Sequence, residues 1–357
     1  MNNNRYGLIM AGGRGTRFWP RSRKRNSKQV LRFFGERTLI QQTVDRLKPV
    51  IPPENIWVIT NDLLKGEIRS QLPEVPKKQI LAEPAQRNTA PCIGLAAQIL
   101  HDADPNAILG VFPADHLILK ENRFRNFVKA AYRVAEENRV VVLGIQPRWA
   151  ETGYGYIEFP KNVKAGATDA LKVTSFREKP DARTAKRFVE RGNFFWNAGM
   201  FFWRTELVLD LMRKHQPKTA TLLAGLPAFK SKSFKDGLAA AYPLCEDISV
   251  DYAILEKADE VSGIALDDIG WNDVGSWSAV YDLAEKDQNG NAARGDLVVE
   301  NSRGNYVDAE KTVALVGVND LVVIDTPDAL LVASREHAQD VSKLVKTLDR
   351  EKREKLL

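Results

Sequence analysis

The stretch Leu8-Ile-Met-Ala-Gly-Gly-Arg-Gly-Thr-Arg-Phe-Trp-Pro-Arg-Ser-Arg23, followed by Ser27-Lys28-Gln29, decides the fold. It begins in a short apolar run, residues 6–10, that predicts a buried strand. The run leads directly into Gly12, Gly13 and Gly15, which allow a sharp turn in which successive backbone N–H groups point at one anion. The stretch therefore predicts the first strand of an α/β sheet with an anion-binding loop after it.

Positive charge is concentrated in the same segment, where seven cations and no acid lie between residues 14 and 28. They are Arg14, Arg17, Arg21, Arg23, Lys24, Arg25 and Lys28. Guanidinium and ammonium groups make charge-assisted hydrogen bonds to phosphate oxygens, so the pattern predicts a polyphosphate site. The alternative is a glycine-rich turn beside a solvated basic face.

The two common phosphate loops do not fit. A Walker A loop requires Gly-Lys at a fixed spacing after the first glycine, which neither Gly12 nor Gly13 has. The dinucleotide fingerprint requires a third glycine where Phe18 stands. The remaining pattern, Gly-Gly-x-Gly-Thr-Arg-x-x-Pro with a lysine downstream, resembles the signature of the sugar-nucleotide pyrophosphorylases.

Composition limits the class of protein. The chain has 357 residues, 44% of them hydrophobic and 27% charged, which is ordinary for a globular protein of two domains. No apolar run approaches the roughly 18 residues of a membrane span, and the first residues lack a secretory signal. Cys92 and Cys245 lie far apart, which argues against a disulfide framework or a zinc site. We expect a cytoplasmic protein with no membrane partner.

The formal net charge of +6 permits nucleic-acid binding. The excess charge, however, is localised beside the glycine loop, which favours a small polyanionic substrate over a duplex. No zinc-finger, RNA-recognition or basic-zipper pattern supports the other interpretation. We therefore expect no nucleic-acid partner.

Short apolar strands alternate with helices in the first half of the chain, which is typical of an open α/β sheet covered on both faces. Strands are predicted near residues 8–10, 56–60, 79–82, 107–112 and 140–144, and helices near 39–47, 64–72, 91–101 and 123–137. Ligands of such sheets bind at the carboxyl ends of the strands.

The second half of the chain is richer in strands. They are predicted at residues 155–159, 170–178 and 199–203, with helices near 205–214 and 249–257. After a turn at residues 287–291, short strands follow at 296–300, 312–316, 321–325 and 329–333, and then a helix at 336–349. We expect a catalytic domain over residues 1–286 and a small β-rich domain, resembling a few turns of a β-helix, over residues 287–357.

Two acids are candidates for chemistry. Asp115 follows the strand at 107–112, where a carboxylate can hold Mg²⁺ if phosphates supply further oxygens. A helix-capping or turn role is the alternative. Asp273 stands in a glycine-flanked turn beside Trp271, and Asp267 and Asp268 are equally acidic neighbours. Sequence alone does not show that Asp115 and Asp273 meet.

Three further stretches predict a surface for a polar ring compound. They are Thr152-Gly-Tyr-Gly-Tyr156, Arg177-Glu-Lys-Pro180 and Phe195-Trp-Asn-Ala-Gly-Met200. The first offers glycine backbone and aromatic faces, the second an acid and a lysine, and the third the amide of Asn197. Each could instead be a core aromatic, a solvated ion pair or a tight turn.

Together these motifs resemble those of the mannose-1-phosphate guanylyltransferases, and they cover residues 6 to 280. They are Gly12-Gly-Arg-Gly-Thr-Arg17, Ser27-Lys-Gln29, Glu83-Pro-x-x-Arg-Asn-Thr-Ala90, Phe112-Pro-Ala-Asp-His116, Glu178-Lys-Pro180, Trp196-Asn-Ala-Gly-Met200, Ser249-Val-Asp-Tyr252 and Trp271-Asn-Asp-Val-Gly-Ser-Trp277. The family usually carries a proline where Ser27 stands. The resemblance implies a Rossmann-like open mixed sheet with a small C-terminal β-helix-like domain. Longer relatives add a phosphomannose isomerase domain, whose activity is not expected here.

The resemblance implies transfer of GMP from GTP to α-D-mannose 1-phosphate, giving GDP-mannose and pyrophosphate by direct in-line attack with Mg²⁺. Nucleotide binding would fall to Gly12, Gly13, Arg14, Gly15, Thr16, Glu83, Arg87, Asn88 and Thr89. Arg17, Lys28 and Asp115 would be catalytic, and Asp115 and Asp273 would bind the metal. Gly155, Glu178, Lys179 and Asn197 would bind the sugar phosphate.

The base preference has a separate rationale. The Watson–Crick edge of guanine presents adjacent N–H donors, which a carboxylate accepts with its two oxygens. Glu83 ends a predicted strand where relatives that use pyrimidine nucleotides tend to carry an amide. We therefore hypothesise that Glu83 selects guanine.

Other interpretations remain open at this stage. The chain could be a guanylyltransferase for another sugar 1-phosphate, such as a heptose, or a non-catalytic sensor of nucleotide sugars. A homodimer, if one forms, is expected to use the C-terminal domain.

Overall fold

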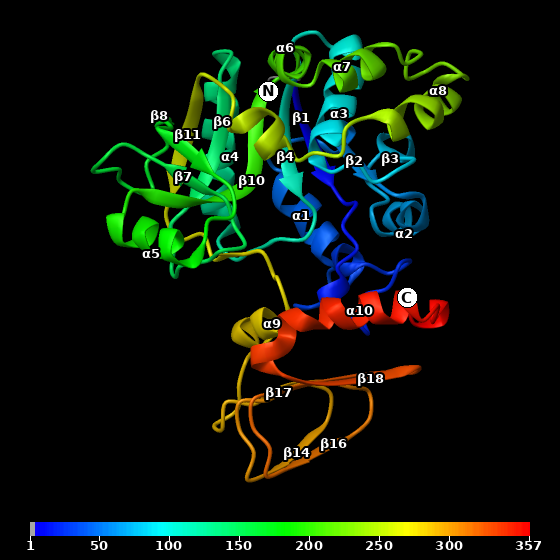
Figure 1. Cartoon of the computed structure of the whole chain (residues 1–357), viewed down its shortest axis with the longest axis vertical. Coiled ribbons are helices and arrows are strands. Elements are labelled where there is room, and N and C mark those ends of the chain that lie inside the picture. Colours follow the sequence, from blue (N-terminus) through cyan, green and yellow to red (C-terminus); the bar gives the residue numbers. More distant parts are fainter. Residues whose placement is uncertain (1–3) are drawn as a thin grey trace.

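The structure is a computed structural model that describes residues 4–357. It has a large α/β part and a smaller β part, with helix α10 (Val341–Arg350) lying between them (Figure 1). In residues 4–357, none of the helices combines the length and apolar character needed to cross a membrane.

A mixed sheet forms the centre of the α/β part. Its main strand order is β3-β2-β1-β4-β10-β6-β11-β8, with β7 paired to β10 and β9 paired to β7. The strands are β1 (Arg5–Met10), β2 (Ile56–Thr60), β3 (Ile80–Ala82), β4 (Ile108–Pro113), β6 (Val140–Ile145), β7 (Tyr156–Glu158), β8 (Leu171–Lys172), β9 (Ser175–Arg177), β10 (Phe194–Arg204) and β11 (Val261–Leu266). Strands β1 to β4 are parallel, and β10 runs antiparallel to both β4 and β6. The open mixed sheet is therefore confirmed.

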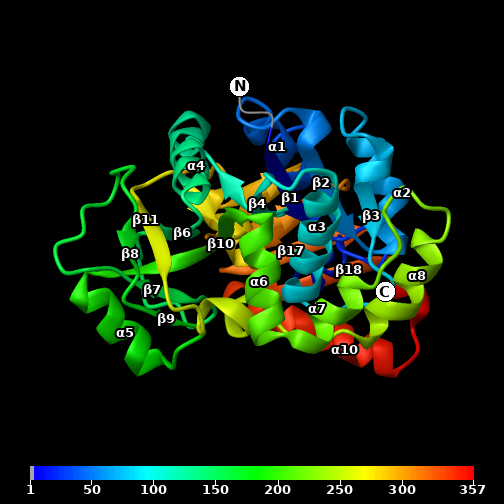
Figure 2. The same cartoon turned by 90° about the horizontal axis from the view of Figure 1, so that it is seen from above.

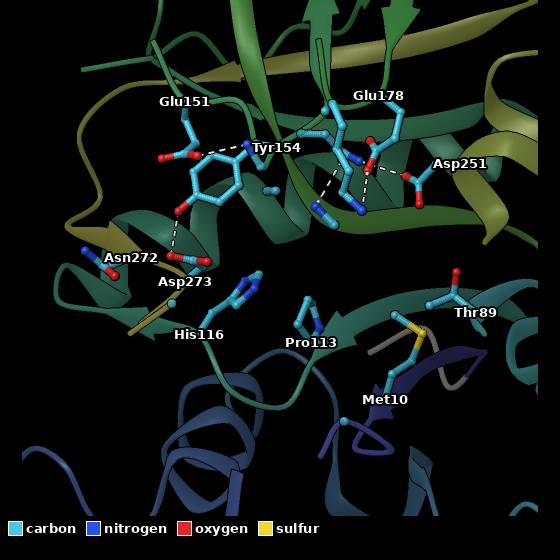
Figure 3. Close-up of a pocket in the computed structure, with 18 of the residues that line it drawn as sticks. Met10, Thr89, Pro113, His116, Glu151, Tyr154, Glu178, Asp251, Asn272 and Asp273 are labelled. Carbon is cyan, nitrogen blue, oxygen red and sulfur yellow. Dashed lines mark hydrogen bonds and ion pairs between the residues drawn. The ribbon is translucent and has the colours of Figure 1, made fainter. Parts of the chain in front are cut away.

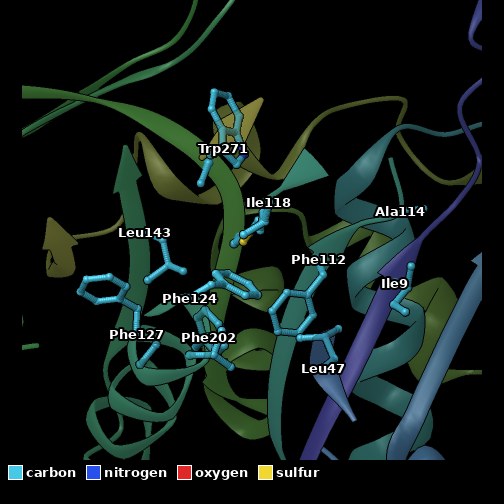
Figure 4. Close-up of a cluster of buried hydrophobic side chains, with 14 of the residues drawn as sticks. Ile9, Leu47, Phe112, Ala114, Ile118, Phe124, Phe127, Leu143, Phe202 and Trp271 are labelled. Atoms are coloured by element: carbon cyan, nitrogen blue, oxygen red, sulfur yellow. The ribbon is translucent and has the colours of Figure 1, made fainter. Parts of the chain in front are cut away.

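Helices cover both faces of this sheet (Figure 2). They are α1 (Leu39–Leu47), α2 (Asp62–Gln71), α3 (Thr89–Ala103), α4 (Glu121–Glu136), α5 (Ala182–Arg191), α6 (Thr205–His215), α7 (Pro217–Ala224) and α8 (Phe234–Ala241). Side chains of α1 and α4 share a core with Ile9 and Phe112 on one face (Figure 4). Side chains of α3 and α6 share a second core with Leu8 and Val111 on the other face. The alternation of Leu8 and Ile9 between the two cores explains the continuous apolar run of β1.

A small two-stranded sheet joins distant parts of the chain. Strand β5 (Leu117–Ile118) pairs antiparallel with β12 (Trp271–Asn272), so that Leu117 lies opposite Asn272. Because β5 starts two residues after Asp115 and β12 ends one residue before Asp273, this pairing brings the segments of both acids together.

The C-terminal part is a short β-helix followed by a hairpin strand. Its elements are α9 (Trp277–Leu283), β13 (Ala292–Arg294), β14 (Leu297–Glu300), β15 (Tyr306–Asp308), β16 (Val313–Val316), β17 (Leu321–Thr326), β18 (Ala329–Ser334) and α10. The strands β13, β15 and β17 are parallel neighbours, as are β14 and β16, whereas β18 is antiparallel to β17. The predicted β-helix-like domain is confirmed.

An asparagine ladder stabilises one corner of these coils. Asn291 Oδ1 accepts hydrogen bonds from the backbone N and Nδ2 of Asn305 at 3.1 and 3.0 Å, and Asn305 Oδ1 accepts one from Leu321 N at 2.9 Å. The corners before the ladder residues have positive φ angles, 68° at Gly304 and 55° at Asp320. Asn291, Asn305 and Leu321 are therefore spaced by 14 and 16 residues, a repeat that was not predicted from the sequence.

The two parts meet along residues 18–24, which we call the seam segment. Trp19 Nε1 donates to the carbonyl of Leu356 at 2.8 Å, and Arg21 makes two hydrogen bonds to Asp308, at 2.7 and 3.1 Å. Arg23 pairs with Asp328 at 2.9 Å. Phe18 and Trp19 also share a hydrophobic core with aromatic and aliphatic side chains of the C-terminal part.

Some predicted elements differ from the structure. The single strand expected over 170–178 is two strands, because β8 pairs with β11 whereas β9 pairs with β7. The helix expected near 249–257 is a π-helical turn, Asp251–Leu255. The helix expected over 336–349 begins as a 3-10 turn, Arg335–Asp340, before α10. The sequence analysis also did not predict several elements, namely helices α5, α7, α8 and α9 and strands β5, β11, β12, β13 and β15.

Candidate active site

A cleft of about 1010 Å³ opens where β1, β3 and β4 end (Figure 3). Many of the predicted site residues line it: Gly12, Gly13, Arg17, Glu83, Asn88, Thr89, Gly155, Glu178, Lys179, Asn197 and Asp273. A second hollow of about 290 Å³ shares Arg17 and Asp273 with the cleft and adds Gly15, Thr16, Lys28 and Asp115. The motifs therefore form one continuous site.

Lys28 stands between the two predicted metal ligands. Its Nζ donates to Asp115 Oδ2 at 2.8 Å and to the backbone carbonyl of Asp273 at 2.6 Å. Burial, the largest single influence, raises the pKa of Asp115, but the charges of Lys28 and His116 and the hydrogen bond from Lys28 together outweigh it, and the pKa lies below its usual value. Asp115 is therefore an ionised carboxylate at neutral pH, as a metal ligand must be.

The glycine loop is shaped around Lys28. Gly15 has a φ of 60°, and a methyl group on it would lie 2.6 Å from Lys28 Cβ. Gln29 Nε2 donates to the carbonyls of Ala11 and Gly13 at 2.7 and 3.1 Å, which fixes the turn from the inside. Close approach of lysine and loop therefore explains why glycine stands at position 15.

Asp273 is held in an unusual turn. The next residue, Val274, has a φ of 48°, which is rare for a β-branched side chain and costs conformational energy. Its backbone N donates to Asn272 Oδ1 at 2.6 Å, and the Asp273 carboxylate accepts a hydrogen bond from the Tyr154 hydroxyl at 2.5 Å. The turn directs the carbonyl of Asp273 at Lys28 and leaves its carboxylate on the cleft (Figure 3).

A buried acid closes another part of the cleft. Glu83 is 8% exposed and accepts a hydrogen bond from the Tyr242 hydroxyl at 2.8 Å. Burial raises the pKa of Glu83 to about 7. A methyl group on Gly12 would lie 2.8 Å from Glu83 Oε1, so the first glycine of the loop leaves room for this carboxylate.

The N-terminus of α3 also faces the cleft, where a helix favours negative charge. Asn88 caps it with a φ of 61° and accepts a hydrogen bond from Thr89 N at 3.0 Å. Thr89 Oγ1 in turn accepts one from Val250 N at 2.8 Å. This bond connects the helix to the turn that carries Asp251.

The remaining part of the cleft holds Glu178, Lys179, Asn197 and Asp251. Lys179 Nζ lies 3.6 Å from Glu178 Oε1, and Asn197 Nδ2 donates to Asp251 Oδ1 at 2.9 Å. Burial, and then the charge of Asp251, raises the pKa of Glu178 to about 7. Paired acids, an amide and a lysine supply donors and acceptors suited to hydroxyl groups and an anion.

Several predicted phosphate ligands lie elsewhere. The exposed Arg14 lines neither hollow. Arg87 donates from Nε to the carbonyl of Pro243 at 2.9 Å, and it too lines neither hollow. Arg21, Arg23 and Lys24 of the seam segment pair with acids of the C-terminal part, and Arg25 lines neither hollow. Of the seven cations, Arg17 lines both hollows and Lys28 lines the second.

The donor set suits a hard divalent cation. Two oxygens, from the Asp115 carboxylate and the Asp273 carbonyl, already surround the ammonium of Lys28, and the Asp273 carboxylate lies on the cleft. Within residues 4–357, no cluster of three or more His, Cys, Asp or Glu side chains could hold a metal alone. Phosphate oxygens of a substrate would complete such a site, as is usual for Mg²⁺.

Comparison with known proteins agrees with this geometry. The nucleotidyl transferase family profile matches residues 6–290, and that of the MannoseP isomerase/GMP-like beta-helix domain matches residues 295–348. The chain has the sheet and cleft of a nucleotidyl transferase, a class that typically uses a divalent metal.

Individual relatives narrow the class. A mannose-1-phosphate guanylyltransferase of Klebsiella pneumoniae is 38% identical over 97% of this chain and 74% of its own length. The alginate biosynthesis protein AlgA of Pseudomonas aeruginosa is 37% identical over 96% of this chain and 72% of its own. A crystal structure of a Thermus thermophilus protein, named a mannose-1-phosphate geranyltransferase, superimposes with a TM-score of 0.86 at 32% identity, covering 97% of this chain and 99% of that one. The chain belongs to the mannose-1-phosphate guanylyltransferase family of nucleotidyltransferases.

Sequence reasoning missed some cleft residues. Asp251 lies in the motif Ser249-Val-Asp-Tyr252, which was recognised without a role for the acid. Tyr154 was read only as an aromatic face, although its hydroxyl binds Asp273. Tyr242, the partner of Glu83, had no motif signal.

Proposed function

We propose that this chain transfers GMP from GTP to α-D-mannose 1-phosphate, giving GDP-mannose and pyrophosphate. The observation that carries the proposal is that the glycine loop, Lys28 with its two acid segments, and the residues Glu178 and Asp251 line a cleft and an adjoining hollow that share Arg17 and Asp273. The family relationship supports the choice of both substrates.

The proposed reaction needs no protein nucleophile. A phosphate oxygen of the sugar 1-phosphate forms a bond to the α-phosphorus of GTP, and the bond from this phosphorus to the bridging oxygen of the β-phosphate breaks. Pyrophosphate leaves with that electron pair. Catalysis then consists of positioning and of stabilising charge as it moves to the leaving group.

Each end of the cleft has a part in this proposal. The backbone of Gly12 to Thr16, with Arg17, holds the triphosphate, and Lys28 stabilises charge on the reacting phosphates. Asn88 and Thr89 support the nucleotide at the start of α3. Lys179 binds the phosphate of the sugar, and Glu178, Asn197 and Gly155 bind its hydroxyls.

Asp115 and Asp273 would hold Mg²⁺, which supplies Lewis-acid polarisation of phosphate oxygens when bound. In the arrangement described here, Lys28 occupies the space between their segments. Its ammonium is on a flexible stem and can turn toward a phosphate once another cation neutralises Asp115.

Selection of guanine is assigned to Glu83. Its carboxylate is almost fully buried beside Gly12, with the Tyr242 hydroxyl as one donor, so a base that cannot donate to it leaves a buried acceptor oxygen unpaired. We expect Glu83→Gln to reduce the preference for GTP over ATP at least tenfold. An unchanged preference would refute this assignment.

The experiment that tests the function is pyrophosphate release with Mg²⁺, crossing four nucleoside triphosphates with mannose, glucose and heptose 1-phosphates. We expect release with GTP and mannose 1-phosphate, abolished by EDTA and by Asp115→Ala. Pyrophosphate release with GTP and a different sugar 1-phosphate would support the proposed reaction but show that mannose 1-phosphate is not the substrate. Absence of release across the grid would favour a nucleotide-sugar sensor.

Three broader expectations belong to the same proposal. The free thiols of Cys92 and Cys245 are buried, which supports a reducing, cytoplasmic location. The division into residues 1–286 and 287–357 is supported by the start of the β-helix at β13, although Trp277 and Val280 of α9 already pack in the core of the C-terminal part. A homodimer contact through the β-helix is supported by exposed apolar side chains on it, namely Val298, Val316, Leu330 and Val332, and sedimentation would test it.

A further inference from the structure

Tyr154 lies where two parts of the cleft meet. Its hydroxyl donates to Asp273 Oδ1 at 2.5 Å, although the two residues are 119 positions apart (Figure 3). Its ring is held edge-on against Trp196 and Trp271, with centroids 5.3 and 5.5 Å away. The phenol is therefore fixed in direction by packing on two sides.

The backbone beside this ring contacts the proposed sugar end. The carbonyl of Tyr154 accepts a hydrogen bond from Lys179 N at 3.2 Å, and that of Gly155 accepts one from Asn197 N at 2.8 Å. The carbonyls of Tyr154 and Gly155 therefore bind the backbones of Lys179 and Asn197, and the Tyr154 hydroxyl binds Asp273.

The Asp273 carboxylate is restricted on its other side as well. A methyl group on Gly275 would lie 3.0 Å from Asp273 Oδ2, so the backbone of the turn runs close to that oxygen.

We infer that Tyr154 is a positioning residue: its hydroxyl orients the Asp273 carboxylate for a divalent cation and links that orientation to the sugar-phosphate end of the cleft. The inference rests on the proposed metal role of Asp273. Partners of metal ligands orient the ligand oxygens, and their loss typically costs about 10- to 100-fold in metal affinity or activity.

The loop that carries Tyr154 is held independently of Asp273. Glu151 accepts hydrogen bonds from Gly153 N at 2.8 Å and Trp149 Nε1 at 2.9 Å, and its carbonyl accepts one from the Tyr156 hydroxyl at 2.8 Å. Tyr154→Phe keeps the ring and its packing, so it removes the bond to Asp273 and leaves the loop in place.

The test measures Mn²⁺ binding to the full chain with GTP by electron paramagnetic resonance, and the Mg²⁺ dependence of pyrophosphate release. For Tyr154→Phe we expect at least tenfold weaker Mn²⁺ binding and a matching shift of the Mg²⁺ midpoint, with kcat restored to within about threefold at saturating Mg²⁺. We also expect mannose 1-phosphate to strengthen Mn²⁺ binding in the wild type and less so in the variant.

Tyr156→Phe is the matched control, because its hydroxyl bonds to the loop and not to Asp273; its Mn²⁺ affinity should not change. In the Asp273→Asn background, Tyr154→Phe should cause no further loss. A loss of activity that saturating Mg²⁺ does not restore, or unchanged Mn²⁺ affinity, would overturn the inference. If Asp273→Asn itself leaves Mn²⁺ affinity unchanged, the proposed metal site is wrong instead.

Discussion

Arg17 and Lys28 face the reaction cleft, whereas Arg21, Arg23 and Lys24, which lie between them in sequence, face the C-terminal β-helix and α10. Both sets belong to one acid-free run of seven cations. Their roles differ because of their partners: Lys28 meets Asp115 inside the α/β part, while the seam cations meet Asp308, Asp328 and Glu354.

This difference shows that local charge density does not identify phosphate ligands. The seam segment closes the hydrophobic core shared by the two parts and lies between the glycine loop and Lys28. Cations of the seam should therefore act on stability, and cations of the cleft on catalysis. The following substitutions test that separation.

The largest effect is expected for Lys28→Met, which removes the ammonium closest to both acid segments. By analogy with the loss of one group that stabilises transition-state charge, kcat should fall about 10²- to 10³-fold. Steady-state pyrophosphate release with GTP and mannose 1-phosphate measures it. Arg23→Ala is the control from the seam and should stay within about threefold of the wild type; an equal loss there would contradict the separation.

Arg21→Ala should have the largest effect on stability. Asp308 has a side chain only 5% exposed, so removing the two hydrogen bonds from Arg21 leaves an almost buried carboxylate unpaired. We expect a loss of about 3 kcal/mol in the free energy of unfolding, because removal of one partner leaves the other charge of a buried ion pair uncompensated. Urea denaturation measures it, with kcat nearly unchanged for the folded variant.

Arg37→Ala is the matched control for Arg21→Ala. Arg37 pairs with Asp45 at 2.8 Å, but both side chains are more than a third exposed, so the loss should stay below about 1 kcal/mol. Equal losses of unfolding free energy in the two variants would mean that the Arg21–Asp308 pair stabilises the protein no more than an exposed ion pair.

The strands of the first half could be predicted because both faces of the sheet are covered. Such burial makes runs like Ile56–Thr60 continuously apolar, and the predicted bounds of that strand match β2. The motif residues Glu83, Glu178 and Asn197 were predicted as nucleotide and sugar ligands through the family resemblance. They line one cleft because each follows or lies within a strand of the same sheet.

Other features depend on contacts that no local pattern records. One run, residues 170–178, pairs first with β11 and then with β7, so it could not be read as two strands from its own residues. The meeting of Asp115 with Asp273 depends on the pairing of β5 with β12, each only two residues long. The partners of Arg21, Arg23 and Lys24 lie some 290 to 330 positions away in the sequence.

A third prediction concerns Glu83, a cleft residue whose substitution should change the free energy of unfolding in a pH-dependent way. Because burial raises its pKa to about 7, the folded protein binds a proton more tightly there than the unfolded chain, whose glutamates titrate near 4.3. This contribution to stability is complete below about pH 4 and is lost as the pH rises through 7. Glu83→Gln should therefore be more stable than the wild type at pH 8 by about 3 kcal/mol, and equal to it at pH 4.

Thermal or urea unfolding of both proteins across pH 4 to 8 measures this difference. A constant difference at all pH values would mean that Glu83 does not titrate as its burial requires. The burial of Glu83 in the cleft would then make no pH-dependent contribution to the free energy of unfolding.

The smallest effect is expected for Lys24→Ala. Lys24 pairs with Glu354 at 2.8 Å and lies 3.6 Å from Asp349, but the side chains of both acids are more than half exposed, so solvent screens the attraction. The free energy of unfolding should fall by less than about 1 kcal/mol, and by less again in 0.5 M salt. Activity should not change, since Lys24 lines neither hollow of the site. A tenfold loss of kcat in a folded Lys24→Ala protein would place this cation with Lys28 rather than with Arg21, and the separation between cleft and seam would have to be redrawn at residue 24.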